Sequence, residues 1–163
     1  MLEPKGGHVL ETATFGGGCF WQVEVEFRNT SGVSDAAVGY MGGELANPSY
    51  EQVCTDRTGH AEVVQVHFDP DEVSYEDLVE RFFEVHDPTQ LNRQGPDVGS
   101  QYRSAIFAHS PEQQRSAQAV IERAQARFER PIVTQIEPAG QFWPAEDYHQ
   151  QYLVKRGLAT CRI

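Results

Sequence analysis

The chain of 163 residues contains little lysine, few cysteines and no long apolar run. No stretch approaches the roughly 20 consecutive apolar residues of a membrane-spanning helix, so a membrane protein is not expected. The N-terminus has no basic segment followed by an apolar core, which predicts no signal peptide and a cytoplasmic location. Only Lys5 and Lys155 are lysines, and 24 acidic residues against 13 basic ones give a net charge of −11. Because most of such a surface repels phosphate, nucleic acid is not an expected partner.

The three cysteines, Cys19, Cys54 and Cys161, are far apart in the chain. An odd number without a CxxC pair is typical neither of a secreted disulfide framework nor of a zinc knuckle. The six histidines show no ligand spacing such as HExxH, so neither a metal nor a cofactor is expected. The three thiols are therefore either inert or include at least one that is chemically active.

Hydrophobic periodicity predicts interleaved strands and helices. Strands are expected at residues 9–15, 33–40, 61–68, 104–108 and 132–137. Helices are expected from Phe20, from Ser74 to His86, from a capping box at Ser110-Pro111-Glu112-Gln113, and over residues 145–155. The long stretch 87–101 is expected to be a functional or mobile loop. Because the elements do not repeat as regular βαβ units, we predict an α+β fold, a two-layer α/β sandwich with a mixed sheet and a ferredoxin-like core.

The segment GGGCFW joins the first strand to the first helix. Glycines permit a tight turn there, and a thiol at the first helical turn lies at the positive end of the macrodipole, which favours the thiolate. Phe20 and Trp21 would provide an aromatic wall beside the sulfur of Cys19. The structural alternative is a free cysteine that packs as a small hydrophobe. A dinucleotide loop is disfavoured, because Trp21 stands where GxGxxG needs its third glycine.

Three further segments place polar groups at strand ends or in loops. They are NPSY, with a phenol at Tyr50; GHAE, with a carboxylate at Glu62; and GPDVGSQYRS, with Asp97 and Tyr102. Each segment taken alone is more simply explained by solvent exposure or by ordinary packing.

Together these segments resemble one family. GGGCFW, GYMGG, NPSY, GHAEVV, FFEVHDPT, DVGSQYRSAI, FWPAEDYHQQYL and a C-terminal cysteine occur in the order and approximate spacing of the A-type peptide methionine sulfoxide reductases. The resemblance runs from about residue 12 to residue 161. The chain departs from the usual pattern at Gln22, where the family has glycine, and in its tail, RGLATC, which lacks the familiar Asn-Pro and Gly-Tyr.

The resemblance implies reduction of the S epimer of methionine sulfoxide, free or peptide-bound, and thereby repair of oxidised proteins. In this interpretation Cys19 attacks the sulfoxide sulfur, and Glu62, its pKa raised beside an apolar wall, protonates the oxygen. Tyr50 and Tyr102 would donate hydrogen bonds to that oxygen, and Asp97 would bond water or orient the surroundings of Cys19.

The resemblance also assigns binding and recycling roles. Phe20 and Trp21 would form the pocket for the S-methyl group. Cys161 would condense with the sulfenic acid of Cys19, and thioredoxin would reduce the resulting disulfide. We expect one catalytic domain over residues 1–163, a monomer, with residues 156–163 as a mobile tail that carries the resolving cysteine. Cys54 is expected to be a core residue.

Two other functions remain open at this point. A cysteine hydrolase or acyltransferase would use Cys19 with His60 or His149 as its base. A non-catalytic module would bind oxidised methionine without turning it over. For both histidines, structural hydrogen bonding is the simpler interpretation.

Overall fold

A computed structural model describes residues 9–157. Its main sheet has six strands in the order β7-β6-β1-β3-β2-β8, and β6 and β7 are the parallel pair that makes it mixed. The six strands are β1 (Glu11–Gly16), β2 (Val33–Met41), β3 (Ala61–Phe68), β6 (Ala105–Ala108), β7 (Gln135–Pro138) and β8 (Trp143–Pro144). A two-stranded hairpin consists of β4 (Arg93–Gln94) and β5 (Asp97–Val98).

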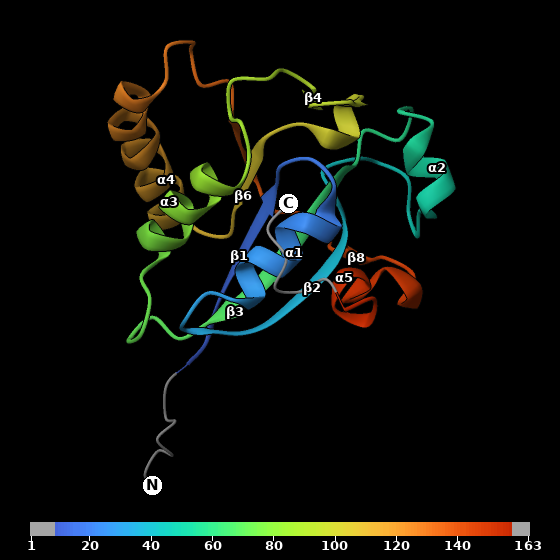
Figure 1. Cartoon of the computed structure of the whole chain (residues 1–163), viewed down its shortest axis with the longest axis horizontal. Coiled ribbons are helices and arrows are strands. Elements are labelled where there is room, and N and C mark those ends of the chain that lie inside the picture. Colours follow the sequence, from blue (N-terminus) through green and yellow to red (C-terminus); the bar gives the residue numbers. More distant parts are fainter. Residues whose placement is uncertain (1–8, 158–163) are drawn as a thin grey trace, which may run out of the picture.

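Five α-helices and three 3-10 turns complete the described chain. The α-helices are α1 (Phe20–Arg28), α2 (Tyr50–Cys54), α3 (Tyr75–Val85), α4 (Pro111–Ala124) and α5 (Tyr152–Lys155). The turns are η1 (Ser100–Tyr102), η2 (Gln125–Arg127) and η3 (Asp147–His149). Figure 1 shows α1 lying across the sheet, with α3 and α4 side by side near one edge.

The core of the fold is a split βαβ pair. The segments β1-α1-β2 and β3-α3-β6 place four strands in the order β6-β1-β3-β2, and every neighbouring pair among them is antiparallel. This is the ferredoxin-like arrangement. The predicted fold class, an α+β sandwich with a mixed sheet, is confirmed.

Strand β3 shows why the elements could be located by periodicity. Val64, Val66 and Phe68 point into the main core beneath the helices, whereas Ala61 and Val63 belong to a smaller apolar cluster. This alternation is the period of two that predicted residues 61–68 as a strand. Both faces of the strand are therefore buried.

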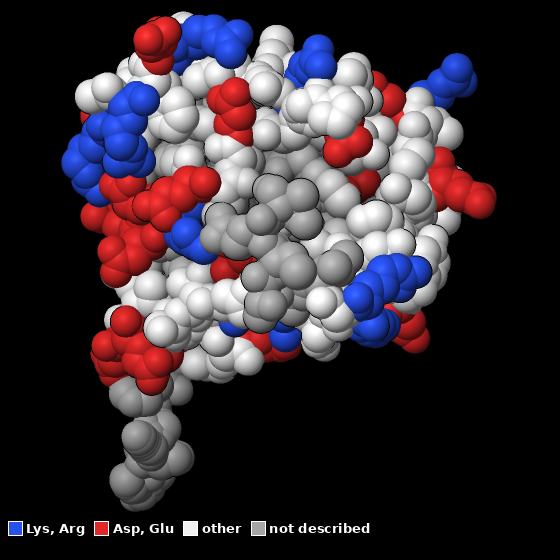
Figure 2. Space-filling model, viewed as in Figure 1, with Lys and Arg blue, Asp and Glu red and all other residues white. Residues whose placement is uncertain are grey.

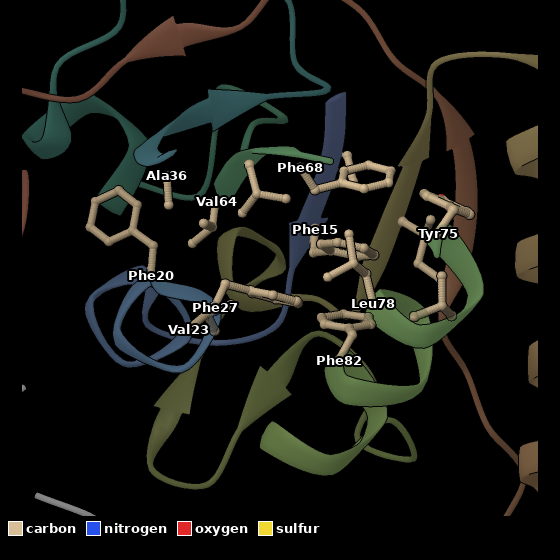
Figure 3. Close-up of a cluster of buried hydrophobic side chains, with 14 of the residues drawn as sticks. Phe15, Phe20, Val23, Phe27, Ala36, Val64, Phe68, Tyr75, Leu78 and Phe82 are labelled. Atoms are coloured by element: carbon tan, nitrogen blue, oxygen red, sulfur yellow. The ribbon is translucent and has the colours of Figure 1, made fainter. Parts of the chain in front are cut away.

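Aromatic rings dominate the main core. Phe15 of β1 stacks on Phe27 of α1 and on Phe82 of α3, with ring centroids 5.0 Å apart in each pair. Figure 3 shows these rings between α1, α3 and the sheet, with Phe20 at the end of the cluster. The same packing that joins the two helices to the sheet therefore fixes the start of α1.

Ion pairs join α3 to α4 and to the turn η2 that follows it. Arg123 lies 3.5 Å from both Glu76 and Glu80, and Arg127 lies 2.8 Å from Glu80. Figure 2 shows acidic and basic side chains interleaved on this side of the molecule. Because these pairs are solvent-exposed, each contributes about 1 kcal/mol or less to stability.

Several predicted elements differ from the structure. The loop 87–101 contains the β4–β5 hairpin. The strand predicted at 132–137 begins only at Gln135, because the N–H of Val133 donates instead to the carbonyl of Pro88. At α4 the capping box is only half formed: Ser110 accepts from the N–H of Gln113, but the Gln113 side chain bonds the N–H of His109.

The helix predicted over residues 145–155 is also wrong in part. Only η3 and α5 are helical, and Gln151 between them adopts a left-handed conformation with φ of 54°. The reason is that Gln150 bonds the backbone of Val38 and the N–H of Gln151 bonds the carboxylate of Glu24. Tertiary contacts have replaced the helical hydrogen bonds at this point.

No helix within residues 9–157 is long and apolar enough to span a membrane.

Candidate active site

A tight turn presents Cys19 at the start of α1. Gly18 has a φ of +90°, which side chains rarely tolerate, and a Cβ on Gly17 would lie 2.8 Å from the ring of Phe82 and 2.9 Å from that of His86. Cys19 is the N-cap residue of α1, and its side chain is partly exposed. The glycines are thus needed to bring the cysteine over the packed end of α3.

Cys19 is a thiol rather than a thiolate in this structure. Burial and, after it, the charge of Glu62 raise its pKa to about 12, although hydrogen bonds from the N–H groups of Trp21 and Gln22 oppose this shift. The expectation that the helix start ionises Cys19 is therefore wrong for the protein without substrate. The helix does favour the thiolate, but desolvation outweighs it.

Glu62 faces the turn from the neighbouring strand. It lies on the same side of β3 as Val64, its side chain is 1% exposed, and its Oε1 accepts a hydrogen bond of 3.2 Å from the N–H of Phe20. Its Oε2 is buried and has no partner among the described residues. Burial raises the pKa of Glu62 to about 8, with the N–H of Phe20 opposing and the charge of Asp97 adding to the shift. At neutral pH the carboxyl is therefore mostly protonated, as the sequence predicted.

The two tyrosines named from the sequence lie at the same site. Tyr50 begins α2, where Ser49 and Gln52 form a capping box, and Tyr102 ends η1. Burial, followed by the charge of Glu62, raises the pKa of both phenols, so both keep their protons and act as donors. Each phenol therefore lies close enough to Glu62 to sense its charge.

Asp97 enters the site from the β4–β5 hairpin. Its charge raises the pKa of Cys19, of Glu62 and of Tyr102, so the carboxylate is near enough to act on all three electrostatically. The hairpin is tied down by Gln94, whose side-chain amide exchanges two hydrogen bonds with the backbone of Asp87. The long loop thus carries a fixed carboxylate rather than a free segment.

Phe20 and Trp21, the predicted aromatic wall, each pack against further aromatic rings. Phe20 is buried, and its ring centroid lies 6.4 Å from that of Tyr50. The indole of Trp21 donates to Nδ1 of His149 at 3.0 Å and stacks on Tyr152, with centroids 3.7 Å apart and planes 8° from parallel.

Sequence reasoning missed the part of the site that comes from residues 145–152. Glu146, His149 and Tyr152 all contact residues of the wall or of α2. For His149 the sequence favoured structural hydrogen bonding. The nearest signal in the sequence was the cluster of aromatic and polar residues in EDYHQQY, which periodicity alone assigned to an ordinary helix.

Of the two remaining cysteines, Cys54 is not where the sequence predicted it, and Cys161 is not described by the structure. Cys54, expected in the core, is exposed at the end of α2, because only Val53 of that short helix is buried. Cys161 lies outside the described residues, so its predicted partner role stays a prediction.

The site lacks the arrangement of a cysteine hydrolase. Both ring nitrogens of His60 bond the loop after β2, to the N–H of Gly43 and the carbonyl of Leu45. Within residues 9–157, no hydrogen bond joins the thiol of Cys19 to a histidine, and no group of three or more potential ligands is placed to hold a metal. What the site offers instead is a thiol, a carboxyl that keeps its proton and has one unsatisfied oxygen, and two phenols.

Comparison with known proteins agrees with this chemistry. The model of the peptide methionine sulfoxide reductase family matches residues 11–163. A curated relative from Acidobacterium capsulatum, peptide methionine sulfoxide reductase MsrA, is 67% identical over 94% of this chain and 100% of its own.

Two solved structures of Mxr1 from Saccharomyces cerevisiae are also similar. The reduced form is 37% identical, covers 95% of this chain and 90% of the other, and has a TM-score of 0.88. A complex of Mxr1 with Trx2 is 27% identical, covers 93% and 90% of the two chains, and has a TM-score of 0.64.

Proposed function

The chain belongs to the peptide methionine sulfoxide reductase family and is an oxidoreductase; on that premise we propose that it reduces the S epimer of methionine sulfoxide through a sulfenic acid on Cys19. The observation that carries the proposal is Oε2 of Glu62, a buried and unpartnered atom of a protonated carboxyl beside the thiol. A buried polar atom normally has a partner, so this one is free to bond the sulfoxide oxygen.

The proposed reaction begins at the sulfoxide sulfur. The sulfur of Cys19 bonds to it while Glu62 gives its proton to the sulfoxide oxygen, and Glu62 recovers the proton that the thiol loses. The sulfur–oxygen bond of the substrate then breaks and the oxygen departs as water. That water attacks the sulfur of Cys19, the bond between the two sulfurs breaks with its electron pair going to the substrate sulfur, methionine leaves, and Cys19 is left as a sulfenic acid. One thiol and one sulfoxide thus become one sulfenic acid and one thioether, with no net uptake of protons.

The remaining groups assist this step. The phenols of Tyr50 and Tyr102 donate to the oxygen as negative charge develops on it. Asp97 orients the surroundings of Cys19, and the rings of Phe20 and Trp21 receive the S-methyl group, where burial contributes roughly 1 kcal/mol per carbon.

Recycling follows through a second thiol. Cys161 condenses with the sulfenic acid, which releases water and leaves a disulfide, and the dithiol of thioredoxin then reduces that disulfide. The complex of the similar yeast protein with Trx2 supports this choice of reductant. We further propose a monomeric, cytoplasmic enzyme of one domain with residues 156–163 as the recycling tail. Its substrates would be oxidised proteins, peptides or free methionine sulfoxide.

One set of assays tests the proposal. Each epimer of a methionine sulfoxide is incubated with the protein and dithiothreitol, and then with thioredoxin and its reductase. We expect reduction of the S epimer alone. Cys19→Ser should abolish it, Cys161→Ser should retain activity with dithiothreitol but lose it with thioredoxin, and Cys54→Ser, the matched control, should retain both.

Other results would contradict specific steps. Ester hydrolysis through an acyl-enzyme would favour the hydrolase, and stoichiometric binding of the sulfoxide without product would favour a binding module. Peptide mapping after substrate without reductant should find Cys19 joined to Cys161; a bond to Cys54 would overturn the recycling step.

A further inference from the structure

The segment that follows β8 is held against the sheet edge by polar contacts. The side-chain amide of Gln150 accepts from the N–H of Val38 and donates to its carbonyl, at 3.0 and 2.9 Å. The N–H of Gln151 donates to both oxygens of the buried carboxylate of Glu24, at 2.9 and 3.2 Å. Figure 1 shows β8 and α5 together beside β2. Glu146 and His149, which lie between β8 and these anchors, are therefore firmly placed.

His149 contacts the aromatic wall through one ring nitrogen. Its side chain is 1% exposed, and Nδ1 accepts the indole N–H of Trp21. Burial lowers the pKa of His149, although the charge of Glu146 opposes this, so the ring is neutral at neutral pH and its proton sits on Nε2. The hydrogen bond to Trp21 thus fixes both the tautomer of His149 and the direction of the indole.

Glu146 contacts the opposite side of the site. Its Oε1 accepts the phenol of Tyr40 at 3.0 Å, and its Oε2 accepts the N–H of Tyr50 at 2.9 Å. Nε2 of His149 lies 3.9 Å from the same Oε1, beyond hydrogen-bond distance, and has no partner among the described residues. The carboxylate therefore fixes the backbone where α2 begins.

The ring of His149 also fills the space between the two sides. Its centroid lies 4.5 Å from that of Tyr50 and 5.2 Å from that of Phe20. A single buried ring thus contacts both residues proposed to bind the methyl group and one of the two phenols proposed to bind the oxygen.

We infer that Glu146 and His149 form a positioning pair, which sets the separation of Trp21 and Tyr50 and thereby determines how the sulfoxide is seated. The inference rests on the substrate-binding role proposed above for these two side chains. The pair acts through Trp21 and Tyr50 and does not itself touch the reacting atoms. It would explain why a buried histidine with one unsatisfied nitrogen is placed between them.

Two substitutions of His149 separate hydrogen bonding from packing. His149→Phe keeps a ring but removes both nitrogens, whereas His149→Asn keeps an acceptor close to the position of Nδ1. His67→Phe is the matched control, because His67 bonds Thr12 at the other end of β3. KM and kcat are measured with methionine sulfoxide and dithiothreitol. The indole N–H of Trp21 is followed by NMR and assigned in a Trp143→Phe background, which leaves one indole.

The expected effects follow from the loss of one buried hydrogen bond. In His149→Phe, the exchange of the Trp21 indole N–H with solvent should accelerate about tenfold, and KM should rise about five- to tenfold, more than kcat falls. His149→Asn should restore slow exchange and lower KM at least halfway toward the wild-type value. His67→Phe should change neither quantity by more than about twofold.

A double-mutant cycle tests the pair independently of how well any one variant folds. Glu146→Gln should raise KM about threefold. In the double variant Glu146→Gln/His149→Asn, KM should rise by less than the product of the two single-variant increases, because the residues act together. The inference would be overturned if the two substitutions raised KM by independent factors that multiply in the double variant. It would also be overturned if the exchange rate of the Trp21 indole N–H were unchanged in His149→Phe, even in an active enzyme. A wild-type protein unable to reduce methionine sulfoxide, with the Trp21 signal responding as expected, would instead overturn the proposed function.

Discussion

Two sets of polar side chains, the bonded cluster and the open cluster, differ in how completely they are hydrogen-bonded. The bonded cluster comprises His86, Ser104 and Thr134. The two ring nitrogens of His86 bond the carbonyl of Phe82 and the hydroxyl of Ser104, each at 2.7 Å, and Ser104 bonds Thr134 at 2.7 Å. Burial lowers the pKa of His86 to about 4, so this cluster stays neutral and fully paired at neutral pH.

The open cluster comprises Glu62, Gln101 and His149. Each of these side chains is at least nine-tenths buried, and each has one polar atom without a partner among the described residues. Buried polar groups that serve only the fold are normally satisfied, as in the bonded cluster. We propose that the unpartnered oxygen of Glu62 in the open cluster is arranged for the substrate, whereas the bonded cluster supports the turn.

The largest expected loss of activity follows from a substitution of Glu62 in the open cluster. Glu62→Gln keeps an oxygen that can accept from the N–H of Phe20 but removes the acidic proton. We expect kcat/KM for methionine sulfoxide to fall about 10²- to 10⁴-fold, as for loss of a general acid. Glu112→Gln, on the exposed surface of α4, is the control and should leave kcat/KM unchanged. A loss of less than tenfold in Glu62→Gln would contradict the proposed role.

A smaller effect is expected for the two phenols beside the open cluster. Tyr50→Phe and Tyr102→Phe each remove one donor to the developing charge while keeping the ring. Each should lower kcat by about tenfold, and the double variant by more than either alone, because the loss of a preorganised donor raises the barrier. Steady-state kinetics with dithiothreitol measure this. If only KM changes, the phenols bind the substrate and do not stabilise the transition state.

The raised pKa of Glu62 predicts that the stability of the protein depends on pH. The carboxyl of Glu62 keeps its proton up to about pH 8 in the folded protein, whereas its ordinary pKa is 4.5. Between these values the folded state binds more protons than the unfolded state, so the contribution of Glu62 is fully present below pH 4.5 and is lost as the pH rises through 8.

Urea denaturation from pH 5 to pH 9 of the wild type and of Glu62→Gln isolates this contribution. The stability of the wild type should decline relative to the variant by up to about 1.4 kcal/mol per pH unit. Other titrating groups, such as Glu24 and His86, are common to both proteins and cancel. A constant difference across this range would show that Glu62 ionises at its ordinary pKa.

The smallest effect on catalysis is expected from the bonded cluster. Ser104→Ala leaves Nε2 of His86 and the hydroxyl of Thr134 without their partner. The free energy of unfolding should fall by about 1–3 kcal/mol, while kcat/KM at a temperature where the variant is folded should stay within about threefold of the wild type. A large loss of kcat/KM without a loss of stability would remove the distinction between the two clusters.

Local patterns predicted most of the fold. Strand β3 was located to the residue because its faces alternate, and the start of α4 was found from the caps at Ser110 and Pro111. The helix over residues 145–155 was not predicted correctly, because Gln150 and Gln151 bond residues more than 100 positions away. Periodicity contains no information about such contacts.

For the same reason, the sequence indicated which side chains belong to the site but not how deeply they are buried. The sequence identified the side chains that surround Glu62, because their motifs are local. It failed on the ionisation of Cys19, since the helix start is visible in the sequence but the extent of burial is not. It also misplaced Cys54, because the exposure of a five-residue helix depends on its neighbours.

The proposed mechanism requires that Glu62 be protonated at neutral pH, and infrared spectroscopy measures this directly. Infrared difference spectra between the wild type and Glu62→Gln, recorded from pH 5 to pH 10 without substrate, report the carbonyl band of a protonated carboxyl. We expect the band to be present at pH 7 and to disappear with a midpoint near pH 8. A spectrum that contains only carboxylate bands at pH 6 and above would contradict the role of Glu62 as the proton donor.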